Sequence, residues 1–213
     1  MDGGNSPQIQ SIELSRLRPT QLTVGMLEVK HKRRRLRALE KRPAELVAFI
    51  LQMPIRVVIG PAKNAYVIDH HHLGLALLKE NFKSAPMHVE ADFSHLRIRA
   101  FWKRMRADQY LHLVNAKGTH KPLRNLPRDL ECLKDDPYRS LAGFVRSAGG
   151  FAKTPTPFAE FQWADFFRQR INEKLLRKRF ESCIAKGVRL AKSPEAANLP
   201  GYIGRTPPRK GRR

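Results

Sequence analysis

The alternation of apolar and polar positions predicts a small α/β domain in the first half of the chain. Residues 55–59 form a β-branched run, and a second β-rich run at residues 66–68 follows a short turn. A polar tetrapeptide then leads into residues 73–79, whose leucine-rich composition favours a helix. The order strand, turn, strand, polar loop and helix indicates an α/β arrangement.

Weaker patterns extend this domain on both sides. We predict a strand that runs into a turn at residues 9–17, a basic helix at 24–39, a helix with one apolar face at 44–52, and a further strand at 87–91. We therefore place a small α/β domain at residues 9–95 and expect residues 1–8 to be disordered.

The rest of the chain has mostly helical patterns. The longest covers residues 158–186, where apolar side chains recur at four-residue spacing: Trp163, Phe167, Ile171 and Leu175. We predict a mostly α-helical extension at residues 96–191 that packs on the α/β domain. Residues 192–213 are rich in proline and basic residues, so we expect a basic flexible tail there.

The charge adds a function class to this picture, because 41 lysines and arginines outweigh 19 acidic residues and leave a net charge of +22. Such a chain attracts polyanions, of which nucleic acid is the commonest in a cytosol. The basic residues gather in four blocks, at residues 30–42, 97–106, 177–179 and 205–213. Such a block can also be a solvated helix face, so the charge leaves both interpretations open.

Other features exclude some classes of protein. No apolar run approaches the roughly 20 residues that a membrane span needs, and residues 1–8 have no secretory signal pattern. Cys132 and Cys183 lack the spacing of a disulfide framework or of a cysteine-rich zinc site. We therefore expect a cytoplasmic protein with no membrane partner.

The polar tetrapeptide Asp69–His72 is the first candidate for chemistry. It lies where a strand ends and a helix begins, and the free N–H groups and positive dipole end of a helix start suit an anion. Imidazoles can hold phosphate, exchange protons or bind metal, although neighbours on a helix diverge by about 100° and at most two could share one ion. The alternative is structural: Asp69 caps the helix and the histidines are polar surface.

Several short segments together resemble the ParB-like nuclease family. They are Leu-Arg-Pro-Thr-Gln at 17–21, Val-Val-Ile-Gly-Pro at 57–61, Asp-His-His-His-Leu at 69–73, Asp-Asp-Pro-Tyr-Arg-Ser-Leu-Ala at 135–142 and Phe-Ala-Glu-Phe-Gln-Trp at 158–163. The resemblance runs from about residue 9 to about residue 171. This family is similar in turn to the ParB/sulfiredoxin superfamily, which implies a small ParB/sulfiredoxin-like α/β fold and binding of nucleotide phosphates at an Asp-Gly-His-His-Arg-like loop.

The resemblance carries over to this loop residue by residue. Asp69, His71 and His72 match the acid and the paired histidines, which implies that they are the catalytic residues. His70 stands where the superfamily has glycine, and Leu73 stands where it has an arginine that can clamp a phosphate. No cysteine lies in the loop, so a sulfiredoxin activity is disfavoured.

Further residues are candidates for phosphate binding beside the loop. Thr20 and Gln21 stand where free-serine kinases of the superfamily have a His-Glu pair, and glutamine cannot act as a general base. Lys30 and Lys32 follow in the segment that would pack beside the loop, where they would contact the same anion, as would His70. A solvated lysine in a basic block is the alternative for both.

A second candidate cluster lies at residues 135–139, at the start of a predicted helix. Asp135 and Asp136 are adjacent carboxylates that could bind a divalent metal, with Tyr138 and Arg139 beside them. More often such a pair caps the helix and pairs with arginine.

Three functions follow from these patterns. The first is a ParB-like nuclease-family protein that binds a phosphorylated ligand, either nucleotide or nucleic acid, at the Asp-His-His-His loop and carries out phosphodiester or phosphoryl chemistry. A divalent metal or a nucleotide is the candidate cofactor. The second is a non-catalytic DNA-binding protein that acts through the basic blocks. The third is a structural adaptor whose loop has no ligand.

Overall fold

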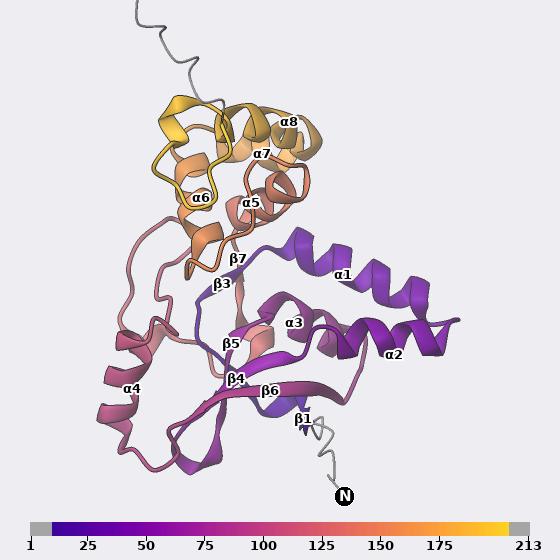
Figure 1. The fold of residues 1–213 in the computed structure, drawn as a ribbon, viewed down its shortest axis with the longest axis vertical. Coiled ribbons are helices and arrows are strands. Elements are labelled where there is room, and N and C mark those ends of the chain that lie inside the picture. The colour runs from indigo at the N-terminus through magenta and orange to yellow at the C-terminus, as the bar shows by residue number, and fades with distance from the viewer. Residues whose placement is uncertain (1–9, 205–213) are drawn as a thin grey trace, which may run out of the picture. The chain divides into compact units, whose positions relative to one another are not determined.

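The computed structural model describes residues 10–204, which form two compact units (Figure 1). The first unit runs to Asp135 and the second begins at Asp136. Residues 96–135, which we predicted as the start of the helical extension, group with the first unit. The segments predicted as disordered, 1–8, and as the end of the tail, 205–213, lie outside the described residues.

A mixed five-stranded sheet is the centre of the first unit. Its strands are β1 (Gln10–Glu13), β2 (Leu17–Pro19), β4 (Ile55–Ile59), β5 (Ala65–Asp69) and β6 (Ser84–Asp92), in the spatial order β1-β6-β4-β5-β2. β5 runs antiparallel to β4 and parallel to β2, while β6 runs parallel to β4 and antiparallel to β1. The mixed α/β fold predicted from the sequence is therefore confirmed.

The predicted strand at residues 9–17 is instead two strands with a bend between them. A 3₁₀ turn, Leu14–Arg16, separates β1 from β2. Leu14 and Leu17 are both buried, and residues three apart lie on opposite faces of a continuous strand. Because side chains three apart align in a 3₁₀ turn, the bend lets both leucines enter one core.

Helices cover both faces of this sheet. α1 (Met26–Leu39), α2 (Pro43–Leu51) and α3 (His71–Lys79) pack against one face, where Val57 and Val67 point. α4 (Ile98–Ala107) covers the other face, where Val58 and Tyr66 contact Phe101. Successive strand residues point to opposite faces, so these two strands supply both cores. The apolar face of α4 explains why residues 96–135 belong with the sheet.

A short parallel pair completes the first unit. β3 (Thr23–Val24) pairs with β7 (Lys134–Asp135), which brings Asp135 beside the start of α1 although the two are far apart in sequence. The short connection between β2 and α1 therefore gains a second support from residues 134–135.

The second unit is helical. It contains α5 (Pro137–Ser147), α6 (Ala159–Arg168), α7 (Glu173–Lys178) and α8 (Phe180–Ala191) around a core that includes Trp163 and Phe167. The single long helix predicted at 158–186 is wrong, because the chain breaks after α6. Asn172 begins a new helix by accepting hydrogen bonds from the N–H groups of Lys174 and Leu175 at 2.9 and 3.3 Å.

Residues 192–204 are packed, which contradicts a flexible tail over this stretch. Ala196 is fully buried, and Leu199 and Tyr202 pack against the core of the second unit. The indole N–H of Trp163 donates to the carbonyl oxygen of Pro200 at 2.8 Å. Although this segment is rich in proline and basic residues, its few apolar side chains are enough to hold it on the core. Over residues 10–204, no helix is long and apolar enough to cross a bilayer.

Candidate functional site

The loop between β5 and α3 holds the predicted catalytic residues. Asp69 is the exposed last residue of β5, and its Oδ1 accepts a hydrogen bond from the His70 N–H at 2.7 Å. Burial acts to raise the pKa of Asp69, but the charges of His70, His71 and Arg56 and this hydrogen bond together hold it below the ordinary value. Asp69 is therefore an ionised carboxylate at neutral pH.

His70 has a left-handed backbone conformation, with φ of 67° and ψ of 25°. Glycine adopts this conformation most readily, which gives a physical reason for the glycine found there in the wider superfamily. Histidine accepts some strain at this position. Its Nδ1 lies 2.8 Å from the carbonyl oxygen of Pro54, which anchors the loop to the chain that precedes β4.

His71 is buried, at 4% exposure, in the first turn of α3. Its Nε2 accepts the backbone N–H of Thr20 at 3.4 Å. The Thr20 hydroxyl in turn donates to the carbonyl oxygen of Val67 at 2.7 Å. Thr20 and His71 therefore lie side by side, and together they connect the end of β2 to β5 and α3.

His72 is also buried, at 8% exposure, and it contacts the start of α1. Its Nε2 accepts the Gly25 N–H at 2.9 Å and lies 3.4 Å from a carboxylate oxygen of Glu28. One ring nitrogen cannot accept the first hydrogen and donate to the second partner at once, so the two contacts compete. The starts of α1 and α3 meet at this imidazole.

The residues around this meeting point are mostly buried and polar. Gln21 donates from Nε2 to the carbonyl oxygen of Thr23 at 2.8 Å. The Thr23 hydroxyl oxygen, in a residue with 1% exposure, has no hydrogen-bond partner within the described part of the chain. Asp135 accepts the Met26 N–H at 3.0 Å. The start of α1 is therefore held by two distant side chains, His72 and Asp135.

The second predicted cluster does not form one site. Asp136 caps α5 instead, since its Oδ1 accepts the N–H groups of Tyr138 and Arg139 at 2.9 and 3.3 Å, and its Oδ2 lies 2.6 Å from Arg168. The Tyr138 hydroxyl donates to the carbonyl oxygen of Ile171 at 2.6 Å. Asp135 and Asp136 thus stabilise the starts of two different helices, which is the alternative that the sequence left open.

Burial raises the pKa of Asp136 to about 6, although Arg168 and the two N–H groups act to lower it. Within residues 10–204, no group of three or more His, Cys, Asp or Glu side chains could hold a metal ion. Neither candidate cluster therefore supplies a ready-made cage for a divalent metal.

The two predicted lysines lie on α1. Lys30 is exposed and lines a shallow groove of about 330 Å³ with Arg33, Arg34 and Arg37. Glu80 pairs with Arg33 and Arg37 at 2.5 and 2.7 Å. Lys32 is half-buried. No hydrogen bond or ion pair described for Lys30 joins it to the loop at 69–72, and its neighbours are other cations of α1.

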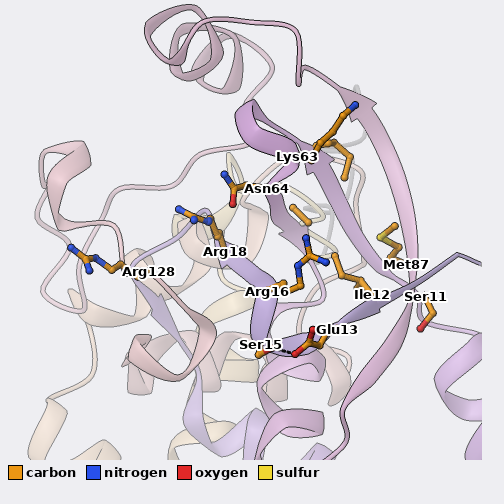
Figure 2. Close-up of a pocket in the computed structure, with 12 residues that line it drawn as sticks. Ser11, Ile12, Glu13, Ser15, Arg16, Arg18, Lys63, Asn64, Met87 and Arg128 are labelled. Atoms are coloured by element: carbon orange, nitrogen blue, oxygen red, sulfur yellow. Dashed lines mark hydrogen bonds between the residues drawn. The ribbon is translucent and has the colours of Figure 1, made fainter.

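A pocket that sequence reasoning missed lies beside β1 and β2. It has a volume of about 420 Å³ and is lined by Ser11, Ile12, Glu13, Ser15, Arg16, Arg18, Ile59, Lys63, Asn64, Ala65, Met87 and Arg128 (Figure 2). The exposed Arg16 and Arg18 alternate with the buried Leu17 and Pro19, a pattern that was visible in the sequence. The contribution of Arg128 depends on a long-range contact that no local pattern reveals.

Two comparisons with known proteins agree with this fold. The profile of the family described as "Putative ParB-like nuclease" matches residues 10–169, and the chain belongs to this family. The crystal structure of protein Atu1540 from Agrobacterium tumefaciens is similar, with a TM-score of 0.85 and 41% sequence identity over 94% of this chain and 100% of that one. Among curated proteins, none matches this chain.

Proposed function

We propose that this protein binds nucleic acid through the basic face of α1. The main observation behind this proposal is a groove formed by Lys30, Arg33, Arg34 and Arg37. The spacing of these residues places them on neighbouring turns of one helix. Glu80 pairs with two of these cations, so the groove keeps a positive charge. Membership of a ParB-like nuclease family and the net charge of +22 support the same partner.

The chemistry of this face suits phosphates rather than base edges. Lys30 and Arg34 are exposed, and residues 30–37 extend over about 10 Å of helix, which is the length of a few phosphate steps along one strand. Long cationic side chains on such a surface neutralise phosphates and release counterions, which gives binding with little dependence on sequence.

The test is the salt dependence of duplex DNA binding, measured by fluorescence anisotropy. Lys30→Ala combined with Arg34→Ala removes two cations while leaving the pairs of Glu80 intact. We expect the slope of log K against log salt to become less steep by about 1.8, since each phosphate contact contributes about 0.9. Arg97→Ala with Arg99→Ala removes the same charge from an exposed segment and serves as the control.

Equal losses in both double variants would mean that only the net charge matters, which contradicts a site on α1. A wild-type protein without measurable DNA affinity at low salt would contradict the proposed function altogether.

A second candidate function is phosphoryl or phosphodiester chemistry at the Asp69–His72 loop. It is favoured by one arrangement: the ionised, exposed Asp69 adjoins the start of α3, and the buried imidazoles behind it fix the loop to Thr20 and Gly25. In this proposal Asp69 contacts the ligand, while His71 and His72 hold the loop in position.

The measurement is nicking of supercoiled DNA with and without added magnesium or manganese. Cleavage that Asp69→Asn abolishes while DNA affinity is retained would support the second function. Wild-type protein that binds DNA without nicking it under either condition would contradict this function and leave the first intact.

A further inference from the structure

We propose that the pocket beside β1 and β2 binds a small phosphate monoester, with the phosphate held by Arg16 and Arg18. This pocket shares no lining residue with the groove on α1 or with the loop at 69–72, and it does not depend on the proposed function. Figure 2 shows Arg18 and Asn64 close together, with Arg16 nearer to Ile12 and Arg128 farther away at the left of the view.

The first argument is uncompensated charge. Within the described residues, none of Arg16, Arg18 and Arg128 forms an ion pair with a carboxylate. The single acidic residue of the lining, Glu13, accepts a hydrogen bond from the Ser15 hydroxyl. Like charges gathered at one pocket repel each other, and a bound anion removes that cost. Guanidinium groups also match the geometry of phosphate oxygens with paired donors.

The second argument concerns the lysine of the lining. Lys63 is occupied elsewhere, since its Nζ lies 2.9 Å from the Ser94 hydroxyl and 3.7 Å from Asp92. The arginines are therefore the cations that remain for a ligand.

The third argument concerns size and the rest of the lining. A volume of about 420 Å³ exceeds what one phosphate fills and falls within the range of small-molecule sites. Ile12, Ile59, Ala65 and Met87 supply apolar surface. Asn64 uses its Nδ2 on the carbonyl oxygen of Pro61 at 2.8 Å, which leaves its side-chain oxygen to accept from a hydroxyl. A sugar phosphate or a nucleoside monophosphate has this combination of groups.

The test is isothermal titration calorimetry with ribose 5-phosphate and a nucleoside 5′-monophosphate, beside ribose and the free nucleoside. We expect binding by the phosphorylated compounds only, and a loss of roughly tenfold or more in affinity for Arg16→Ala with Arg18→Ala. Both arginines are exposed, so this double variant should keep the wild-type melting temperature. Arg97→Ala with Arg99→Ala is the charge-matched control, and it should bind as wild type does.

A phosphate monoester can be a free metabolite or the end of a nucleic acid strand. Short oligonucleotides with a 5′-phosphate or a 5′-hydroxyl separate these sources, tested in the Lys30→Ala, Arg34→Ala background that weakens the α1 groove. Preference for the 5′-phosphate that is lost on removing Arg16 and Arg18 would assign the pocket to strand ends. Absence of binding by every phosphorylated compound at millimolar concentration, or equal loss in the control variant, would overturn the proposal.

Discussion

Two regions of the first unit contain residue types that suggest a function: the loop at 69–72 and the pocket beside β2. They differ in whether their polar side chains already have partners within the protein. In the loop at 69–72 the imidazoles of His71 and His72 are buried and accept backbone N–H groups. In the pocket beside β2, Arg16 and Arg18 are exposed and have no carboxylate partner among the described residues. A polar side chain that satisfies a buried backbone group is part of the scaffold, whereas an unpaired exposed cation is available to a ligand.

The largest effect expected from this comparison is on stability. His72→Ala leaves the Gly25 N–H without its partner and opens a cavity at the start of α1, so we expect unfolding to cost about 2–4 kcal/mol less. Urea denaturation of purified variants measures this change. Asp69→Asn is the exposed control, and a loss of equal size there would contradict the distinction between the two regions.

Asp136 is a buried polar side chain of the second unit, and its pKa tests whether burial controls such a scaffold residue. Its folded-state pKa of about 6 exceeds the ordinary 3.8, so the folded protein binds more protons than the unfolded chain between these values. The stability tied to this carboxyl is therefore fully present below about pH 4 and decreases as the pH rises through about 6. Arg168→Gln removes the positive charge that lowers this pKa, and should raise it further.

A carboxyl titration followed by NMR measures the Asp136 pKa directly. An inflection near 4 in the wild type, or a decrease in Arg168→Gln, would show that burial does not control this group.

A smaller loss of stability is expected at Asp135. Asp135→Ala removes the acceptor for the Met26 N–H, and the loss of such a cap costs about 1 kcal/mol. The matched variant Asp135→Asn retains an acceptor oxygen and should recover most of the difference. If alanine and asparagine were equally destabilising, the carboxylate would act by charge rather than as the cap of α1.

The smallest effect is expected where the cations are exposed. Arg16→Ala with Arg18→Ala should change the free energy of unfolding by no more than about 0.5 kcal/mol, because neither side chain supports a carboxylate or a buried backbone group. Thermal and urea unfolding check this. A loss of several kcal/mol would assign these arginines to the scaffold and remove the basis for a ligand site.

The sequence predicted local elements better than distant pairings. The strand at 55–59 and the helix following the histidines came from strong local patterns, and both are present in the structure. The break after α6 was missed because Trp163, Phe167 and Ile171 remain buried at four-residue spacing across it, and only the Asn172 cap marks the new helix. Apolar periodicity reports the core-facing side and does not reveal where the backbone turns.

The candidate site shows the same limit. The sequence placed Asp69 and the histidines at a strand end and helix start, as the structure has them. It could not show that His72 supports α1 or that Asp135 caps it, because both contacts join residues far apart in the chain. Whether a histidine is a ligand or a scaffold residue depends on such contacts.

The most direct test of this account maps a DNA duplex onto the ¹⁵N-labelled full chain by chemical-shift perturbation at moderate salt. The account predicts that the largest changes fall on residues 30–37 of α1, with much smaller changes at residues 69–72. Chemical-shift changes centred on the loop at 69–72, with α1 unaffected, would contradict this account. They would indicate that the histidine loop binds the DNA.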